Sequence, residues 1–257
     1  MIEKDILETS KKLIKKFEGI NKQGFIKGIK PQTKGSAGLT FEKLIGNEND
    51  NFQIADYHGI EIKVKANNRI NGRYTSLFSL VPSNCFGLKL KELRNKYGYP
   101  DKDFPAINCI NKSVFVNIKT ATTNGFYFNL KIDYLKEKLI LLVYDSNDNI
   151  VDSELYWDFD EVISAINRKL KYLAFVKYDK KYIGGQKYFK YTKIKFYKFK
   201  GVKTFFQLLK KGIIRLYICL GVYKSNYKVG KEHDHGIRFD IKECDLNMLY
   251  DEYNIID

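Results

Sequence analysis

Asp56, Glu61 and Lys63 are residues of the kind, and at the spacing, that could catalyse a reaction at a phosphate group. Side chains two apart on a strand point the same way, so Glu61 and Lys63 face together, and Asp56 on a neighbouring strand can meet them. Two carboxylates, with the backbone carbonyl of Ile62 between them, form an oxygen-rich site that suits Mg²⁺. Such an ion lowers the pKa of a bound water and neutralises charge that grows on a phosphate. The pattern predicts a phosphodiester hydrolase in which Lys63 orients the water, helps to deprotonate it or stabilises the transition state.

The same three residues also have a purely structural explanation. In a chain with 29% charged residues, an acid and a lysine often form an ordinary ion pair on the exposed face of a hairpin. The short pattern therefore depends on its context.

The surrounding sequence supplies elements that could position these residues. FQIADYHG (52–59) and IEIKVKA (60–66) alternate polar with apolar residues, which predicts a strand pair turning at His58 and Gly59. LTFEKLIG (39–46) before them predicts a helix with a cap at Ser36 or Thr40 and a stop at Gly46, and SLFSLV (76–81) predicts a third strand.

The rest of the chain reads as a mixture of helices and strands. We expect an amphipathic helix that ends before Gly19, helices near 88–98, 160–169 and 204–212, and a last helix in 245–253. We expect strands in 114–120, 125–133, 138–145, 150–157, 173–179, 187–199 and 213–223, the first four as an antiparallel meander. The predicted fold class is α+β, with a mixed β-sheet flanked by helices.

The charge of the chain is concentrated in one stretch. The net charge is +15, and residues 171–231 hold sixteen Lys and one Arg against a single acid, Asp179, with nine Tyr interleaved. Such a stretch favours a polyanionic partner, nucleic acid above all. The alternative is a solvated face in a protein of generally Lys-rich and Asn-rich composition. The change of charge divides the chain into residues 1–150, the predicted catalytic lobe with the metal site, and residues 151–257, the predicted DNA-recognition lobe.

Several function classes are disfavoured by composition. No stretch approaches the roughly 18 apolar residues of a membrane helix, so we expect a cytoplasmic protein without a membrane partner. The four cysteines never form a Cys-x-x-Cys pair, so neither a zinc knuckle nor a disulfide framework is indicated.

The order GSAGLTFEKLIG, Asp56, GIEIKVK, SLFSL resembles the MutH-like branch of the PD-(D/E)xK nucleases, and within it the MvaI/BcnI type of restriction endonuclease. The resemblance adds Glu42, on the helix before the first strand, to the catalytic group. It implies a restriction-endonuclease-like core with two lobes that form a DNA-binding cleft. It further implies cleavage of double-stranded DNA with Mg²⁺, Mn²⁺ as a substitute, and Ca²⁺ supporting binding without cleavage. We expect a monomer, with a cognate DNA methyltransferase as a genomic companion.

A second match lies in GKEHDHGIRFDI (230–241), because the same enzymes carry a His-Asp-His-Gly segment in a loop that reads bases. The resemblance makes His233, Asp234, His235 and Arg238 candidates for base contacts, which suits their hydrogen-bonding chemistry. A zinc site at the two histidines and the acid is the competing interpretation. The segment is shortened relative to the family, and LYICLGVY before it lacks the Asp and Arg expected as further base readers, so we expect a different recognition sequence.

Further residues are predicted to contact the DNA backbone: Lys34, Ser36, Lys65, Arg69, Arg73, Lys228 and Lys231. Two other functions stay open at this point. One is a MutH-like strand-nicking repair endonuclease, and the other is a non-catalytic DNA-binding module for which the basic stretch suffices.

Overall fold

The computed structural model describes residues 3–33, 35–46, 57–67, 72–85, 89–224 and 228–255, except the side chain of His235. They form two compact units, each built from separate segments of the chain. The first unit comprises Met1–Arg73, Ile166–Gly201 and Leu246–Asp257, and the second comprises Tyr74–Ala165 and Val202–Asp245. The predicted boundary near residue 150 therefore does not coincide with this division. The physical reason is the pairing of β11 (Tyr172–Ile183) with β2 (Glu61–Ala66), which draws a distant segment into the first unit.

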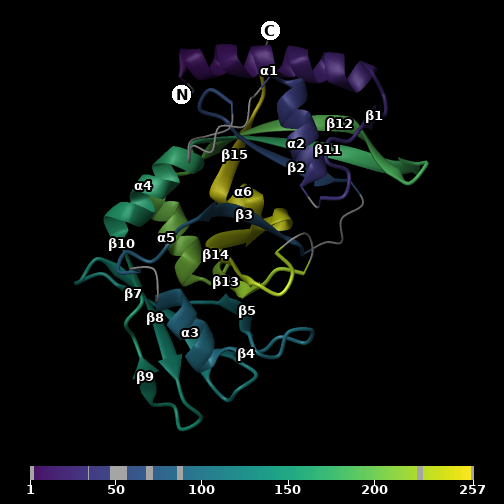
Figure 1. Cartoon of the computed structure of the whole chain (residues 1–257). Coiled ribbons are helices and arrows are strands. Elements are labelled where there is room, and N and C mark those ends of the chain that lie inside the picture. The colour runs from purple at the N-terminus through teal and green to yellow at the C-terminus, as the bar shows by residue number, and fades with distance from the viewer. Residues whose placement is uncertain are drawn as a thin grey trace. The chain divides into compact units, whose positions relative to one another are not determined.

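The first unit contains a mixed sheet in the order β1-β12-β11-β2 (Figure 1). Strands β11 and β12 (Gln186–Phe199) form a long antiparallel hairpin, whereas β2 runs parallel to β11. The short β1 (Ile26–Lys27) and β15 (Tyr250–Tyr253) both pair antiparallel with β12. The predicted α+β class with a mixed sheet is thus confirmed.

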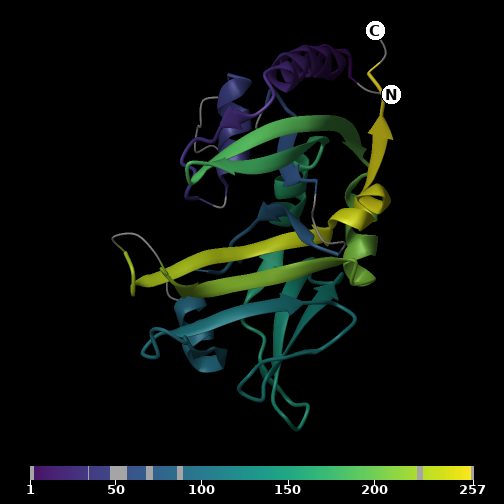
Figure 2. The same cartoon turned by 90° about the vertical axis from the view of Figure 1, so that its right-hand side faces the viewer.

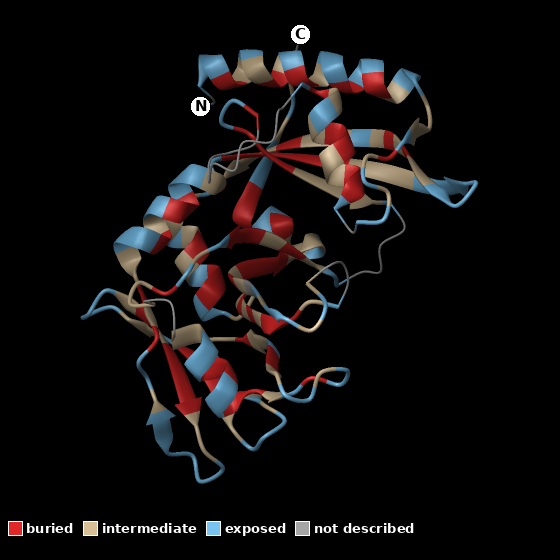
Figure 3. Ribbon diagram, in the orientation of Figure 1, coloured by how far each residue is buried: buried red, intermediate tan, exposed pale blue. Residues whose placement is uncertain are grey.

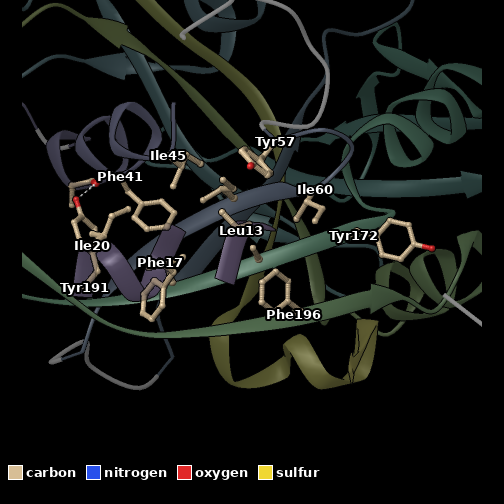
Figure 4. Close-up of a cluster of buried hydrophobic side chains, with 14 of the residues drawn as sticks. Leu13, Phe17, Ile20, Phe41, Ile45, Tyr57, Ile60, Tyr172, Tyr191 and Phe196 are labelled. Carbon is tan, nitrogen blue, oxygen red and sulfur yellow. Dashed lines mark hydrogen bonds between the residues drawn. The ribbon is translucent and has the colours of Figure 1, made fainter. Parts of the chain in front are cut away.

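Two helices bury apolar side chains against this sheet. They are α1 (Lys4–Lys22) and α2 (Ser36–Leu44), and Figure 4 shows their side chains packed with those of the strands. Leu13, Phe41 and Ile60 are fully buried there. Burying one such side chain contributes about 1.5–3 kcal/mol, so this core fixes β2 firmly.

The second unit contains two further sheets. One has the order β10-β8-β7-β6, with β9 also paired to β8; the other has the order β3-β14-β13-β5-β4. Figure 2 shows β13 (Ile214–Val222) and β14 (Glu232–Lys242) as a long antiparallel pair with β5 (Asn108–Val114) beside them. The other strands are β3 (Tyr74–Ser79), β4 (Tyr99–Pro100), β6 (Thr120–Ala121), β7 (Tyr127–Asp133), β8 (Lys138–Tyr144), β9 (Ile150–Asp152) and β10 (Tyr156–Asp158).

Helices α3 (Lys89–Tyr97) and α5 (Val202–Lys210) belong to the second unit, and α4 (Phe159–Lys169) runs from the second unit into the first. The 3-10 turn Glu243–Asp245 and α6 (Leu246–Leu249) precede β15. No helix in the described parts of the chain is both long and apolar enough to cross a membrane.

Four predictions of local structure are corrected. The first helix continues through Gly19 to Lys22, because Ile20 extends its buried stripe. Residues 114–120 lie mostly between β5 and β6, since the buried Cys109 and Ile110 place the strand earlier. The last predicted helix is only one turn long and then becomes β15, which pairs with β12. The His-Asp-His-Gly segment lies on β14 and not in a loop.

Candidate active site and recognition strand

Strand β2 presents Glu61 and Lys63 on one face, as the two-residue spacing predicted. Ile60 and Ile62 are 0% and 4% exposed in the core, so the opposite face of the strand is anchored. Glu61 itself is only 5% exposed. The turn at His58 and Gly59 is also confirmed: both have positive φ, and Tyr57 pairs with Ile60 across it.

Each oxygen of the Glu61 carboxylate is paired with a lysine ammonium group. Lys63 Nζ pairs with Oε1, and Lys169 Nζ lies 3.2 Å from Oε2. Burying a carboxylate is costly unless it is paired, and the two lysines offset that cost. Burial raises the pKa of the Tyr250 hydroxyl, and the negative charge of Glu61 adds to that rise, which places a second buried polar group nearby.

Sequence reasoning missed Lys169. It lies in the last turn of α4, directly before β11, and the register of β11 with β2 sets Leu173 opposite Glu61. The signal was a lysine just before a buried strand, but only the parallel pairing, across 108 residues, shows that it reaches Glu61.

The other predicted members of the site are only partly placed. Asp56, Lys34 and Arg69 lie outside the described residues. Glu42 is half-buried on α2. The pKa of Tyr191 is raised by its burial first, and the charge of Glu42 is among the further causes, so the two groups interact. The participation of Glu42 in metal binding stays a prediction.

The donors at β2 are compatible with a hard divalent cation. Glu61 supplies a carboxylate that already attracts two cationic groups. The hydrocarbon side chain of Ile62 has no donor atom, so its backbone carbonyl is the only ligand that this residue could offer. Within the described ranges, no group of three or more His, Cys, Asp or Glu side chains is arranged to hold a metal ion. The predicted ligand set includes Asp56, which is outside those ranges.

Three of the predicted backbone contacts have contrasting environments. Lys65 and Arg73 line a cleft of about 770 Å³ in the first unit, beside the end of β2. Ser36 also borders this cleft, but it is 1% exposed and its hydroxyl donates to the carbonyl of Ile29 at 2.6 Å. The hydroxyl is therefore engaged within the protein. Ser36 is also not the helix cap: Gly35 precedes the helix and no side chain caps it.

The start of β14 is held by a buried arginine from α3. Arg94 is 0% exposed; its Nη1 donates to Asp234 Oδ1 at 3.0 Å, and its Nη2 lies 2.7 Å from Glu232 Oε1. The hydrogen bond from Arg94 is the main cause that lowers the pKa of Glu232. His233 stacks on Tyr223, with ring centroids 3.7 Å apart and planes at 14°. Asp234 thus has a partner inside the protein.

The turn before β14 carries the last two predicted backbone contacts. Lys228 Nζ lies 5.5 Å from the ring centroid of Tyr223, and Lys231 is exposed. Their contacts with the DNA backbone stay a prediction.

Arg238 forms part of a second cluster that the sequence did not reveal. Its Nε donates to Asp240 Oδ1 at 2.9 Å, and Arg215 Nη2 donates to Asp240 Oδ2 at 3.0 Å. Both guanidinium groups lie over the ring of Tyr217, at 4.7 and 4.6 Å from its centroid. Arg215 also lies 3.4 Å from the ring centroid of Tyr74.

The stretch LYICLGVY lacks Asp and Arg, as the sequence shows, but the predicted strand 213–223 contains Arg215 directly before it. Strand β13 begins at Ile214 and therefore includes Arg215, one residue before LYICLGVY. The available signal was the alternation of apolar residues with Arg215, Tyr217 and Cys219 along β13. The register then brings Asp240 opposite Arg215, which sequence alone could not supply.

Comparisons with known proteins give the family of the chain and two similar solved structures. The chain is similar to the solved structure of restriction endonuclease MvaI in complex with its cognate DNA substrate, with 29% identity, 100% coverage of both chains and a TM-score of 0.87. It is also similar to MvaI in the absence of DNA, with 28% identity, coverage of 100% of this chain and 99% of that chain, and a TM-score of 0.61. A search of curated proteins gave no match. The model of the MvaI/BcnI restriction endonuclease family matches residues 14–250, and the chain therefore belongs to that family.

Proposed function

We propose that this chain, a type II restriction endonuclease acting on DNA, hydrolyses both strands of a short fixed DNA sequence with Mg²⁺ as its metal ion. Asp56, Glu61 and the carbonyl of Ile62 would hold the ion, with Glu42 beside them. Mn²⁺ would substitute for Mg²⁺, and Ca²⁺ would support binding without cleavage.

The observation that carries the proposal is the buried Glu61 carboxylate between two ammonium groups. When bound, the ion supplies a water of lowered pKa and neutralises charge on the phosphate. The Glu61 carboxylate would hold the metal ion and the ammonium groups of Lys63 and Lys169 in position. Lys63, 23% exposed at its side chain, is placed to donate a hydrogen bond to the water or to oxygen that gains negative charge.

Sequence recognition would come from the face of the second unit that carries β13 and β14. Arg238 and Arg215 present guanidinium groups, which can donate two parallel hydrogen bonds to guanine. His233, Asp234 and His235 are proposed to contribute at the other end of β14, with Asp234 acting while it is paired to Arg94. Lys228 and Lys231 would hold phosphates and so position the reader without specifying sequence.

The test is a cleavage assay on supercoiled plasmid with Glu61→Ala and Lys63→Ala. Each change should lower the cleavage rate more than about 100-fold, because charge stabilisation at the reacting phosphate is lost. Specific DNA binding measured with Ca²⁺ or without metal should survive. Glu252→Ala is the matched control, since Glu252 is an exposed acid of the same unit that pairs with Lys195.

The products separate the alternatives. Linear plasmid with fixed ends supports the restriction activity, whereas a nicked circle that never becomes linear would favour the strand-nicking alternative. Binding without any cleavage in Mg²⁺ or Mn²⁺ would favour the non-catalytic module. Wild-type cleavage rates for Glu61→Ala would refute the site.

The proposed activity would also damage the DNA of the cell that makes the enzyme. A nuclease that cuts a short sequence must share its compartment with a methyltransferase that protects the same sequence, so we propose a cytoplasmic monomer encoded beside a DNA methyltransferase. Expression without that methyltransferase should be toxic to a host, and co-expression should relieve the toxicity. Equal viability in both cases would contradict this pairing.

A further inference from the structure

The cleft of about 770 Å³ in the first unit is bordered by a hairpin to which no role has been given so far. Strand β2 contributes Lys65 to the lining of this cleft, and the β11–β12 hairpin contributes Lys180, Tyr182 and Lys187. With Arg73, the lining holds four cationic side chains against one acid, Asp179. The cleft is therefore suited to an anionic ligand.

The carboxylate of Asp179 already accepts a hydrogen bond from another residue of the chain. Its Oδ1 accepts a hydrogen bond from Asn67 Nδ2 at 2.8 Å, and the same amide nitrogen donates to Thr192 Oγ1 at 2.9 Å. The carboxylate is thus held by the neighbouring amide.

The hairpin presents its cations together with an exposed aromatic ring. Tyr182 stands directly opposite Lys187 in the register, and Lys180 stands opposite the buried Phe189, so Lys180, Tyr182 and Lys187 share one face. Lys180 is exposed, whereas Lys187 is half-buried and its Nζ donates to the carbonyl of Thr33 at 3.4 Å. Tyr182 is 59% exposed, and Lys180 Nζ lies 6.0 Å from its ring centroid. Residues 180–186, at this end of the hairpin, are all exposed, and the tip of the hairpin is pale blue in Figure 3.

A ring between cations suits one kind of ligand especially well. A nucleic-acid backbone offers phosphates at a regular spacing together with sugars and bases, whereas a small inorganic anion offers no apolar surface for Tyr182. The register puts Tyr178 opposite Ala66, so Lys180 and Tyr182 share the face of Val64 and Ala66 and not the face of Glu61 and Lys63. Lys65, which follows Lys63 by two residues, about 7 Å along β2, lines the cleft at the end of that strand.

We propose that this cleft binds the DNA backbone outside the sequence that is read, with Lys180 and Lys187 each contacting a phosphate and Tyr182 packing against a sugar or base. The inference rests on the proposed function, since it takes DNA as the substrate. It adds a subsite that contributes affinity without contributing specificity.

The experiment compares Lys180→Ala, Lys187→Ala and their double variant with Lys181→Ala. Lys181 is the matched control because it is the neighbouring exposed lysine of the same strand, it points to the opposite face, and its Nζ lies 4.2 Å from the ring centroid of Phe25. Binding to a cognate and a scrambled duplex is titrated with Ca²⁺ at several salt concentrations. Thermal melting checks that each variant is folded.

Each cleft lysine removed should flatten the slope of log K against log salt by about one unit. The loss should be equal on cognate and scrambled DNA, so their affinity ratio should not change. Tyr182→Ala should weaken both about tenfold with an unchanged slope, and Tyr182→Phe should bind as wild type. On a duplex trimmed to the recognised sequence, all these effects should vanish.

Two results would overturn the inference: slopes for the double variant that equal those of Lys181→Ala, or losses confined to cognate DNA. These failures are separable from failure of the proposed function. If the wild type binds and cleaves DNA while the cleft variants keep its salt slope, only the subsite is refuted. If the wild type does not bind DNA, the proposed function itself fails.

Discussion

Glu61 illustrates how much of the site depends on charge balance at one residue. Its carboxylate is buried and each oxygen is paired with an ammonium group, one from its own strand and one from α4. A paired carboxylate inside a protein keeps both its charge and its orientation, because breaking either pair leaves a poorly solvated charge. In the proposed function, Lys63 is the group that would face the substrate. Lys169 holds the other oxygen and is best understood as a positioning residue.

Lys169→Met should lower the cleavage rate about tenfold, because Glu61 loses the partner that fixes its second oxygen. Removing a nearby positive charge should also favour a divalent cation, so the Mg²⁺ concentration for half-maximal rate should fall. Lys169→Arg should recover most of the rate. The measurement is a Mg²⁺ titration of single-turnover cleavage.

The control for this change is Lys171→Met. Lys171 follows two residues later, is exposed, and pairs with Glu3 Oε1 at 2.8 Å, so it tests general loss of charge. A purely structural role for Lys169 would alter the melting temperature while leaving the Mg²⁺ dependence as in the wild type.

At the scale of elements, helices and strands that have a local sequence pattern could be predicted, whereas the register between paired strands could not. Glu61 and Lys63 sit on a strand whose alternation is visible in IEIKVKA, so their common face followed from sequence alone. Strand β14 escaped prediction because its alternation is interrupted. The register of its pairing with β13 shifts between Cys219 and Leu220, next to Gly236, which has a positive φ. Only after Gly236 do buried apolar residues recur at every second position, at Ile237, Phe239 and Ile241.

The β13–β14 pair also explains why Asp240 could not be recognised from sequence. It is 1% exposed and joins two arginines that are 23 residues apart, which only the strand register brings together. A buried carboxylate between two guanidinium groups fixes their direction through charge-assisted hydrogen bonds. Arg238, which is predicted to contact bases, is therefore part of a side-chain cluster with Arg215, Tyr217 and Asp240.

Asp240→Asn should reduce discrimination between cognate and scrambled DNA about tenfold, because both guanidinium groups lose their fixed orientation. Scrambled binding should change little, which distinguishes this result from that of a phosphate contact. The variant should also melt at a lower temperature, since two partly buried cations lose their partner.

Asp148→Asn provides the comparison, as an acid of the same unit whose side chain is 72% exposed. In a double-mutant cycle, Asp240→Asn and Arg238→Ala should be non-additive in their effect on discrimination. Additive effects, or equal losses on both duplexes, would show that Asp240 does not act through Arg238.

At the scale of the whole molecule, the sequence correctly indicated the fold class and showed that the positive charge is concentrated in the second half of the chain. The division that it suggested near residue 150, however, does not follow the pairing of the strands. A change of charge near residue 150 is a property of surfaces, whereas the two units are defined by which strands pair. Strands β11 and β12 carry much of the excess charge and yet form the centre of the sheet that holds Glu61. Long-range parallel pairing such as that of β2 with β11 has no local signature.

This interleaving predicts that the fragments 1–150 and 151–257 cannot fold separately. The first would have β2 without its partner β11, and β5 without β13. The second would leave Trp157 exposed, because this fully buried side chain, the only tryptophan of the chain, packs on β10 beside β8 and its Nε1 donates to the carbonyl of Leu80 at 3.1 Å.

Each fragment alone should therefore lack a cooperative thermal transition, and fragment 151–257 should show red-shifted tryptophan emission. Mixing the two fragments should restore the blue-shifted emission and a cooperative melt, because the break lies at exposed residues of β9 and removes no strand pair of the core. Circular dichroism and fluorescence of each fragment, their mixture and the intact chain measure this directly. A cooperative melt of fragment 1–150 by itself would show that the N-terminal 150 residues form an independent domain, and would mean that the pairing of β2 with β11 is not needed to hold Glu61 and Lys63 in place.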